Sequence, residues 1–337
     1  MIKILQGNCI DKIKELEDNS IDCVVSSPPY FGLRDYGVDG QFGLEKSYKD
    51  YLTNTVKVFE TFKPKLKDTA TIWWNVGDSY SSGKRTSTTN QSLRGDKNYG
   101  VTRTPVQNGI KEKDLLMIPN RVAIVLQDAG WYIRSEIIWH KPNPMPESVR
   151  DRPTSCHEKI WLITKNKKYY YDHESIKEPI TDTTAIRLLQ KNIENQKGSL
   201  RGNGGMKSNG NMKAMGRKKF DKNMGGSGTS FVDHSGYKKA DGSYMINSTR
   251  NKRNVWTITT KPFKDAHFAT FPKDLIEPCI KAGCPEGGVV LDPFGGSGTT
   301  GIVAALNNRN AILIELNQNY IDIANKRIDK EVGLFSG

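Results

Sequence analysis

The sequence lacks the features of a membrane-spanning protein. Hydrophobic residues make up 36% of its 337 positions, but no apolar run approaches the roughly 18–20 residues that a membrane-spanning helix needs. The chain begins with a strand-like stretch, residues 2–5, and shows no signal-peptide pattern. These absences predict a cytoplasmic protein without a membrane partner.

Paired cysteines and histidine clusters are also absent. The five cysteines are scattered, and none belongs to a Cys-x-x-Cys pair, which argues against a disulfide framework and against a structural zinc site. We expect the thiols to be reduced and to behave as small buried hydrophobes. No second histidine follows His157-Glu158 at metal-ligand spacing. The sequence therefore predicts no metal site.

Positive charge, by contrast, is in excess. The chain has 50 Lys and Arg against 37 Asp and Glu, a formal net charge of +13, which points to a polyanionic partner, most commonly nucleic acid. An evenly spread charge would instead serve solubility. The distribution favours the first interpretation, because residues 181–254 alone hold 15 Lys and Arg against 5 Asp and Glu.

Alternating strand-like and helix-like segments predict the fold. Apolar runs typical of buried strands are residues 22–26, 69–76, 131–140, 158–164, 289–291 and 311–314. The spacing of apolar residues predicts helices over residues 48–62, 118–129, 273–283, 299–307 and 318–332. Residues 167–172 are expected to pair with the strand before them as a hairpin. The alternation implies an α/β fold with a doubly wound, mostly parallel, Rossmann-like sheet.

Two polar stretches interrupt this alternation. Residues 79–113 and 195–250 are rich in Ser, Asn, Gly and Lys and lack apolar periodicity, which is typical of surface excursions. We therefore expect residues 1–180 and 255–337 to form the two halves of one domain. The first half would contain the polar loop, and residues 181–254 would be a basic insertion between the halves.

A glycine-rich segment, Asp292-Pro293-Phe294-Gly295-Gly296-Ser297-Gly298-Thr299, lies between a predicted strand and a predicted helix. Glycines allow the backbone to approach a ligand closely, and the following helix N-terminus offers free N–H groups. No Lys-Ser or Lys-Thr ends the segment, which argues against a phosphate-binding P-loop. Glu315 ends the next strand, where a carboxylate can hold a ribose diol. Taken alone, Glu315 is equally typical of an acid at a helix N-terminus.

Ser27-Pro28-Pro29-Tyr30 follows the strand predicted at residues 22–26, and on its own it is typical of a stiff turn. Together with the glycine-rich segment, it resembles the motifs of the N4-cytosine/N6-adenine DNA methylase family. The segments His267-Phe268-Ala269-Thr270-Phe271-Pro272 and Trp139-His140-Lys141-Pro142 resemble further motifs of this family. Because the Ser-Pro-Pro-Tyr segment comes first in the chain, the sequence is identified as a member of the beta group of these enzymes.

The resemblance implies S-adenosylmethionine as the cofactor. The implied cofactor-binding residues are Asn8, Cys9, Thr270, Phe271, Pro272, Asp292, Pro293, Phe294, Gly295, Gly296, Ser297, Gly298, Thr299 and Glu315. Glu315 would hold the ribose. Asn8 departs from the acid that is usual at its position, but its side-chain oxygen can still accept a hydrogen bond from the adenine amino group.

The chemistry that the resemblance implies is methyl transfer to the exocyclic amino group of a base. Such a nitrogen is a poor nucleophile because its lone pair is delocalised into the ring. The Ser27 side chain and the Pro28 carbonyl can accept hydrogen bonds from its two hydrogens and so localise the lone pair in the transition state. Pro29 stiffens the loop, and Tyr30 can stack on a base extruded from the duplex. These four are the candidate catalytic residues.

Double-stranded DNA is the partner that the resemblance implies, in a bacterial nucleoid or a phage-infected cell. In the beta group the target-recognition region lies between the two motifs, which assigns it to residues 181–254. The candidate DNA-binding residues are His140, Lys141, Arg217, Lys218 and Lys219. A cognate restriction endonuclease is a second candidate partner, and the oligomeric state, monomer or homodimer, stays open.

The choice of base depends on one residue. Family members with serine at the position of Ser27 tend to methylate cytosine at N4, and those with aspartate tend to methylate adenine at N6. We therefore expect cytosine N4 and keep adenine N6 as the alternative. A glutamine or RNA methyltransferase would usually carry Asn before the prolines and its cofactor motif first, and both features are absent. A non-catalytic DNA-binding protein on the same fold is a more remote alternative, because both motifs are intact.

Overall fold

The computed structural model describes residues 1–33, 35, 37–38, 40–81, 109–181, 249–260 and 271–333. The chain forms two compact units, Met1–Ser175 with Arg253–Gly337, and Ile176–Lys252. The second unit is described only at its two ends. There the short strand β6 (Glu178–Pro179) pairs with the antiparallel β7 (Thr249–Arg250).

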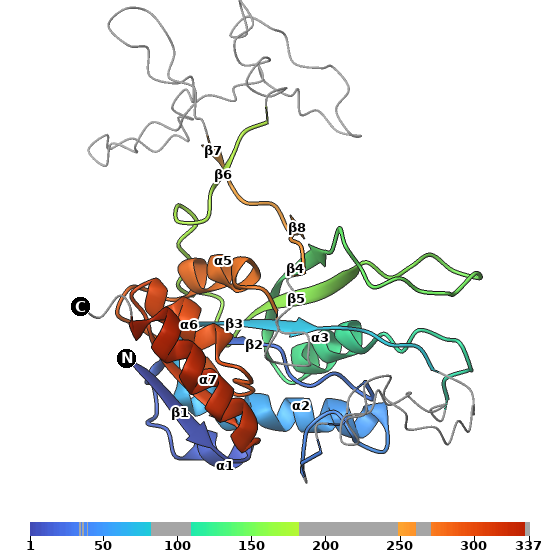
Figure 1. The fold of residues 1–337 in the computed structure, drawn as a ribbon, viewed down its shortest axis with the longest axis horizontal. Coiled ribbons are helices and arrows are strands. Elements are labelled where there is room, and N and C mark those ends of the chain that lie inside the picture. The colour runs from blue at the N-terminus through green and yellow to red at the C-terminus, as the bar shows by residue number, and fades with distance from the viewer. Residues whose placement is uncertain are drawn as a thin grey trace, which may run out of the picture. The chain divides into compact units, whose positions relative to one another are not determined.

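A sheet forms the centre of the first unit (Figure 1), and within the described residues it has eight strands. From one edge to the other these are β1 (Ile2–Gln6), β10 (Asn310–Glu315), β9 (Val289–Asp292), β2 (Ile21–Ser26), β3 (Leu66–Val76), β5 (His157–Thr164), β4 (Tyr132–His140) and β8 (Val255–Thr257). Of these eight strands, β5 alone runs antiparallel to its neighbours. The predicted α/β fold with a mostly parallel, Rossmann-like sheet is confirmed.

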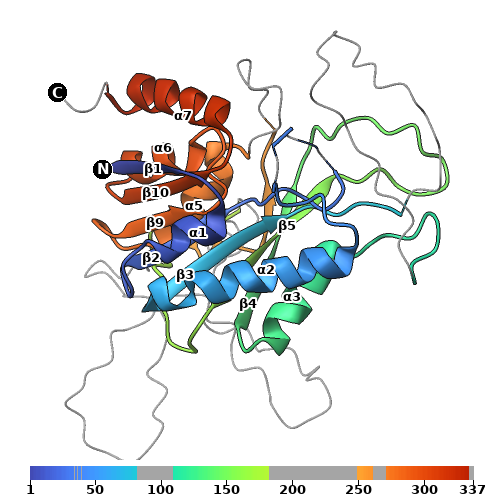
Figure 2. The same ribbon diagram turned by 90° about the horizontal axis from the view of Figure 1, so that it is seen from below.

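Helices cover both faces of the sheet (Figure 2). One face carries α1 (Cys9–Lys14), α2 (Tyr48–Phe62) and α3 (Ile118–Asp128), and the other carries α5 (Lys273–Gly283), α6 (Thr299–Leu306) and α7 (Gln318–Glu331). Alternate side chains of the strands separate the two layers. Ile72 and Trp74 of β3 belong to the same core cluster as the apolar residues of α1, α2 and α3. Trp73, between them, lies against Gly283 of α5 on the opposite face.

The sequence of α2 explains why this helix forms where it does. Ser47 caps its N-terminus: the Ser47 hydroxyl oxygen accepts from the Asp50 N–H at 3.2 Å and the hydroxyl donates to the Asp50 carboxylate at 2.8 Å. A short 3₁₀ turn, Lys63–Lys65, follows its end. The buried side chains repeat at helical spacing and face the sheet; they are Tyr51, Thr55, Val58, Phe59 and Phe62.

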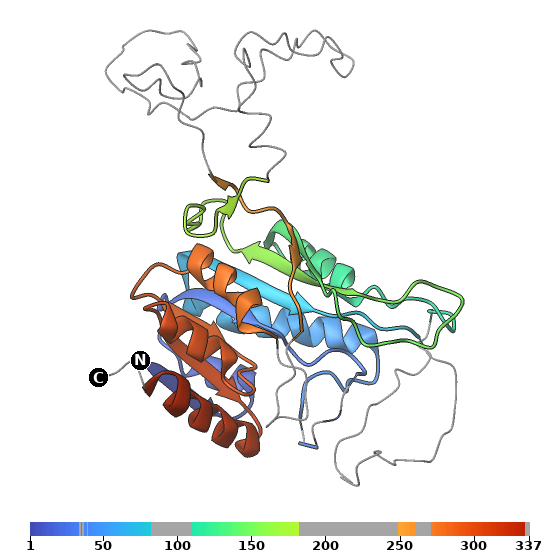
Figure 3. The same ribbon diagram turned by 45° about the horizontal axis from the view of Figure 1, so that its top comes forward.

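Strands from the two ends of the sequence pair at one edge of the sheet. β1 pairs in parallel with β10, and Gln6 lies opposite Glu315. Figure 3 shows this N-terminal part, in blue, beside the orange and red C-terminal elements. β2 and β9, the strands that precede the two sequence motifs, are also neighbours. The motifs are therefore adjacent in space although more than 260 residues separate them in the chain.

The ends of the predicted polar loop, residues 79–113, are tied together. Ser81 N–H donates to the Asp114 carbonyl at 2.8 Å, and Lys113 N–H donates to the Ser81 carbonyl at 2.7 Å. Tyr80 and Leu115 form a bridge beside them. Residues 82–108 lie outside the described part of the chain.

The predicted hairpin at residues 167–172 is wrong. These residues form no strand, and β5 pairs instead with β3 and β4. Tyr170 N–H donates to the Thr69 carbonyl and Asp172 N–H to the Ala282 carbonyl, each at 2.9 Å. The backbone polar groups of this segment thus form isolated hydrogen bonds and not the regular series of a paired strand.

None of the helices in the described residues has the length and apolarity required to cross a membrane.

Candidate active site

The carboxyl ends of the parallel strands meet at one edge of the sheet, here termed the carboxyl edge. β2 ends there at Ser26, β9 at Asp292 and β10 at Glu315. From β9 the chain continues to β10 on one side, whereas from β2 it continues to β3 on the other. The winding therefore reverses between β9 and β2, and ligands of doubly wound folds bind at such a reversal.

The glycine loop, residues 293–298, turns tightly between β9 and α6. Gly295 N–H donates to the Ile314 carbonyl at 2.8 Å, and Gly298 N–H donates to the Gly295 carbonyl at 2.9 Å. Gly298 has a φ of +82°, a conformation that favours glycine. A Cβ at this position would also lie 2.9 Å from the Cβ of Ala324 on α7. Glycine is thus required here for both backbone conformation and close packing.

Asp292 uses both carboxylate oxygens inside the protein. The Ser26 hydroxyl donates to Oδ1 at 2.6 Å, the Thr300 hydroxyl donates to Oδ2 at 2.6 Å, and the Phe294 N–H donates to Oδ1 at 3.0 Å. Burial raises the pKa of this carboxyl to about 6, although the three hydrogen bonds favour its charged form. Asp292 therefore connects the end of β2 to the beginning of α6.

Glu315 holds the glycine loop from the next strand. Its Oε2 accepts from the Gly296 N–H and its Oε1 from the Asn317 N–H, both at 2.8 Å. Burial raises the pKa of the carboxyl, and these backbone donors lower it. Each oxygen keeps a further lone pair, which fits the predicted hydrogen bonds to a ribose diol. Asn317 caps α7, so Glu315 also meets the description of an acid at a helix N-terminus.

Arg327 supports the glycine loop from α7. Its Nη1 donates to the Ser297 carbonyl at 2.6 Å, and to the hydroxyls of Ser297 and Thr299 at 2.9 Å. Its Nε lies 3.4 Å from a carboxylate oxygen of Glu331. Burial lowers the pKa of this guanidinium, and the charge of Glu331 opposes the shift. The sequence offers little signal for Arg327, because it is one of several basic residues in a predicted helix.

The other predicted cofactor-binding residues lie at the same edge where the structure describes them. Asn8 caps α1, and its side-chain oxygen accepts from the Ile10 N–H at 2.9 Å. Burial raises the pKa of the Cys9 thiol to about 12, which keeps it protonated. Phe271 and Pro272 directly precede α5. Thr270 lies outside the described residues.

The Ser-Pro-Pro-Tyr loop, residues 27–30, is held by close contacts on two sides. The ring of Tyr30 lies against the backbone of Gly77, where a Cβ would come within 2.4 Å of Tyr30 Cε2. The Pro29 carbonyl accepts from the buried Tyr51 hydroxyl at 3.3 Å. Pro28 is buried. The loop thus presents its hydroxyl groups from a packed backbone.

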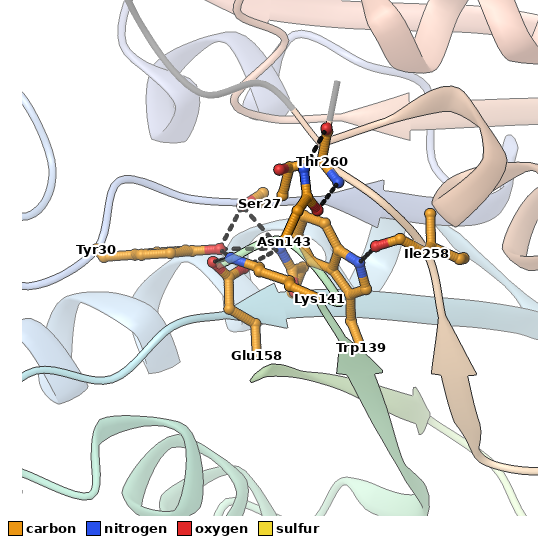
Figure 4. A network of polar contacts seen from close by, with 9 residues as sticks. Ser27, Tyr30, Trp139, Lys141, Asn143, Glu158, Ile258 and Thr260 are labelled. Carbon is orange, nitrogen blue, oxygen red and sulfur yellow. Dashed lines mark hydrogen bonds and ion pairs between the residues drawn. The ribbon is translucent and has the colours of Figure 1, made fainter. Parts of the chain in front are cut away.

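The hydroxyls of this loop belong to a polar network at the carboxyl edge (Figure 4). The Ser27 hydroxyl lies 3.2 Å from Tyr30 Oη, and the Tyr30 hydroxyl lies 2.6 Å from Glu158 Oε2. The side-chain amide of Asn75 donates toward Tyr30 Oη at 2.8 Å, Glu158 Oε2 at 3.1 Å and Ser27 Oγ at 3.3 Å. Burial raises the pKa of Tyr30 well above its usual value, and the charge of Glu158 adds to the shift.

His140 and Lys141 lie at the end of β4, close to this network. Lys141 forms an ion pair with Glu158, and its ammonium lies 4.3 Å from the centre of the Trp139 ring. His140 Nδ1 lies 3.2 Å from the Thr257 hydroxyl. The other three predicted DNA-binding residues, Arg217, Lys218 and Lys219, lie outside the described residues. Within the described ranges, no group of three His, Cys, Asp or Glu side chains could hold a metal ion.

Asn75 and Glu158 are site residues that the sequence did not predict. Asn75 offered a weak signal, as a polar residue near the end of an apolar strand. Glu158 follows His157 in the sequence, but the position of this pair depends on strand direction. Because β5 runs antiparallel to its neighbours, its first residues lie at the carboxyl edge. That direction could not be read from the sequence of β5 itself.

The protein has a Rossmann-like sheet, with a glycine loop and a proline-stiffened polar loop on adjacent strands. This arrangement is typical of a methyltransferase. The family of N6/N4 DNA methylases, described as DNA methylase, matches residues 21–326, and the chain belongs to this family. It is a DNA methyltransferase, and the cofactor of its family is S-adenosylmethionine.

Curated relatives match along almost the whole chain. The type II methyltransferase M.SmaI of Serratia marcescens is 41% identical over 329 residues, which cover 97% of this chain and 90% of that protein. The type II methyltransferase M.Cfr9I of Citrobacter freundii is 39% identical, with 97% of this chain and 88% of that protein covered.

Solved structures share the fold at low sequence identity. The PvuII DNA methyltransferase, described as cytosine-N4-specific, has a TM-score of 0.57 at 16% identity, covering 97% of this chain and 86% of the other. A protein from Thermus thermophilus, assigned as a DNA modification methylase and complexed with S-adenosyl-L-methionine, has a TM-score of 0.53 at 19% identity, covering 98% and 96%. At these identities the likeness is one of fold.

Proposed function

We propose that the protein methylates the exocyclic amino group of a base extruded from double-stranded DNA, and that this base is cytosine, modified at N4. The observation that carries the proposal is the place of Ser27. It presents an uncharged hydroxyl at the end of β2, beside Ser26, whose hydroxyl donates to Asp292, the residue directly before the glycine loop. Methylation of adenine at N6 is the alternative.

The residues of the carboxyl edge fit S-adenosylmethionine. When bound, this cofactor supplies an electrophilic methyl group on a positively charged sulfur. Glu315 keeps lone pairs for the ribose hydroxyls, and the N–H groups at the start of α6 can receive the carboxylate of the methionine part. The Phe294 ring, with its centroid 5.3 Å from that of Phe42, offers an apolar wall. Asp292 would shape the pocket rather than contact the cofactor, because its side chain is fully buried and three donors of the chain already bind its oxygens.

The residues of the Ser-Pro-Pro-Tyr loop would act on the base. Ser27 Oγ and the Pro28 carbonyl oxygen would accept hydrogen bonds from the two amino hydrogens. This holds the nitrogen lone pair out of the ring as the nitrogen becomes tetrahedral. The packed backbone of residues 27–30 fixes both acceptors before the base arrives, and proximity to the glycine loop aligns the nitrogen with the methyl group.

A nucleoside digest tests the reaction and the base together. Unmodified plasmid DNA would be incubated with the protein and S-adenosylmethionine, hydrolysed to nucleosides and analysed by mass spectrometry. We expect N4-methylcytosine. Detection of N6-methyladenine alone would replace cytosine by the alternative base. Absence of any methylated nucleoside, with DNA still bound, would favour the non-catalytic DNA-binding protein.

We also propose that residues 181–254 are the target-recognition region, with His140 and Lys141 contacting DNA at the carboxyl edge. The local excess of positive charge supports this assignment. Replacing Arg217, Lys218 and Lys219 by glutamine should weaken DNA binding and lower the slope of log affinity against log salt by up to about 3.

The matched control for this variant removes three exposed lysines from α1 and α2, where no DNA contact is proposed: Lys14, Lys49 and Lys57. Affinity measured at several salt concentrations should change less for the control. Equal slopes for the two triple variants would assign the basic cluster to solubility. A cognate restriction endonuclease is the further partner that we propose, since the curated relatives are type II methyltransferases.

A further inference from the structure

A chain of hydrogen bonds leads from the proposed acceptor to a charged group. It runs from the Ser27 hydroxyl to Tyr30 Oη over 3.2 Å, and from the Tyr30 hydroxyl to Glu158 Oε2 over 2.6 Å (Figure 4). The side-chain amide of Asn75 lies beside all three groups. Two of these residues belong to the Ser-Pro-Pro-Tyr loop, whereas Asn75 and Glu158 come from the neighbouring strands β3 and β5.

Glu158 forms an ion pair in a largely buried position. Only 16% of its side chain is exposed, and Lys141, 19% exposed, forms an ion pair with its other oxygen, Oε1. The paired ammonium compensates the buried negative charge. Because Lys141 occupies Oε1, Oε2 is the oxygen that faces the Ser-Pro-Pro-Tyr loop.

The charge of Glu158 determines which hydroxyl donates in each of the two hydrogen bonds of the chain. An ionised carboxylate only accepts hydrogen bonds, so the Tyr30 hydroxyl must donate to it. Burial beside Glu158 raises the pKa of Tyr30, and the phenol therefore keeps the hydrogen that it donates. Tyr30 Oη can then only accept from its remaining neighbours. In the hydrogen bond between them Ser27 is therefore the donor, and its hydrogen points to Tyr30 Oη rather than to a base.

Direction matters because a serine hydroxyl can act in two ways. It carries one hydrogen and two lone pairs, so without a fixed partner it could present its hydrogen to an amino group and repel it. An aspartate at this position would have no hydrogen to misdirect. Asn75 adds to the constraint, since its N–H groups can only donate, and they approach both Ser27 Oγ and Tyr30 Oη.

We propose that Glu158 is a positioning residue that makes Ser27 an obligatory hydrogen-bond acceptor for the amino group of the target base. It acts through Tyr30, and Asn75 assists it. The inference rests on the proposed function, in that Ser27 receives the amino group. It assigns Tyr30 a role besides stacking: the Tyr30 hydroxyl transmits the orientation from Glu158 to Ser27.

The central experiment replaces Glu158 by glutamine, which keeps the size and removes the charge. The glutamine amide can donate to Tyr30 Oη, so the chain can reverse and turn the Ser27 hydrogen toward the base. We expect kcat for methyl transfer to fall about 10- to 100-fold, while the Kd for S-adenosylmethionine and the KM for DNA stay within about threefold. Glu158→Asp should recover part of the lost kcat, since it restores an acceptor.

Double variants separate this role from a structural one. In a Ser27→Ala background there is no serine hydrogen to direct, so Glu158→Gln should reduce kcat by less than about twofold further. Tyr30→Phe breaks the same chain but leaves the Glu158–Lys141 ion pair intact. It should reproduce the kcat loss of Glu158→Gln, and the two changes together should be no worse than either alone. Tyr30→Phe also serves as the test if Glu158→Gln does not fold.

A neighbouring ion pair provides the matched control. Glu136 Oε1 on β4 lies 2.5 Å from Lys159 Nζ on β5, the strand that carries Glu158. This ion pair shares no residue with the Glu158–Lys141 pair. Glu136→Gln should keep the wild-type kcat. Full additivity of Glu158→Gln with Ser27→Ala, or wild-type kcat in both Glu158→Gln and Tyr30→Phe, would overturn the proposal. All rates refer to whichever base the wild type methylates, so an error in the proposed base does not affect this result.

Discussion

The two loops at the carboxyl edge stand on adjacent strands and are built by different means. The glycine loop is shaped by its backbone, through glycines with positive φ and the Gly296 N–H group bound to Glu315. The polar side chains around it, such as Asp292, find their partners within the protein. The Ser-Pro-Pro-Tyr loop is instead fixed by packing against Gly77 and Tyr51, and its hydroxyls enter a network that ends in an ion pair.

This difference separates two kinds of requirement. A cofactor pocket needs a shape, and the glycine loop supplies that shape with close backbone contacts and shared hydrogen bonds. A group that polarises an amino nitrogen needs a defined hydrogen-bonding direction as well as a position. Changes in the first loop should therefore alter folding and cofactor affinity, whereas changes in the second should alter the rate of transfer.

Asp292→Ala should give the largest effect and test the first half of the comparison. The substitution removes the acceptor of the Ser26 and Thr300 hydroxyls and of one backbone N–H. We expect the free energy of unfolding to fall by about 2–4 kcal/mol and cofactor binding to be lost. Urea unfolding and calorimetric titration with S-adenosylmethionine would measure both. Tyr30→Ala is the control and should leave cofactor binding intact. Equal cofactor affinity in wild type and Asp292→Ala would contradict the assignment of Asp292 to the cofactor pocket.

The pH dependence of stability should also reveal the burial of Asp292. Its folded-state pKa of about 6 lies above the ordinary value near 4. The folded state therefore binds the proton more tightly, and this stabilisation is fully present below about pH 4 and is lost as pH rises through 6. Relative to Asp292→Asn, the wild type should lose up to about 3 kcal/mol between pH 4 and 7. Urea unfolding of both proteins at several pH values would measure this. If the difference in their free energies of unfolding were the same at every pH, the raised pKa of Asp292 would be contradicted.

Ser26 and Ser27 allow the comparison to be made at two adjacent residues. Ser27→Ala removes the proposed acceptor, and kcat should fall about 100-fold with little change in cofactor affinity or stability. Ser26→Ala removes a bond to Asp292, so it should lower stability by about 1 kcal/mol and change kcat far less. Single-turnover methylation and urea unfolding of both variants would test this. Similar kinetics for the two variants would remove the distinction between the loops.

Arg327→Lys should give the smallest effect. A lysine ammonium keeps the charge but cannot reproduce the contacts of the guanidinium with Ser297 and Thr299. The Kd for S-adenosylmethionine should rise about 5- to 10-fold, with kcat unchanged at saturating cofactor. Lys326→Ala, at the exposed neighbouring position, is the control and should bind the cofactor normally. A loss of kcat in Arg327→Lys without a change in Kd would show that Arg327 affects the transfer step rather than cofactor binding.

The fold could be predicted from the sequence because its strands and helices have regular apolar patterns. All six residues of β2 are buried, and a continuous apolar run bounded by prolines is a local signal. The prediction of a hairpin at residues 167–172 was wrong because strand pairing depends on residues distant in the sequence. β5 pairs with β3 and β4 instead.

The residues of the candidate site also fall into two groups, those that a local motif predicts and those that only the tertiary arrangement brings into the site. Motif residues such as Ser27 and Asp292 follow strands, and their nearness follows from strand order. Glu158, Asn75 and Arg327 could not be assigned from the sequence, because their roles depend on which strand runs antiparallel and which face of a helix meets a loop. No local pattern encodes either of these.

The short pair of β6 and β7 has a consequence for how such enzymes diverge. These strands flank the long stretch between residues 181 and 249, and Arg250 Nε lies 3.0 Å from Glu178 Oε1 across them. The pair brings the two ends of that stretch together, so its length and sequence can change at a small entropic cost to the rest of the fold. Under the target-recognition role that we propose for residues 181–254, exchange of the segment between residues 178 and 250 would change the DNA sequence that is recognised and leave the first unit unchanged.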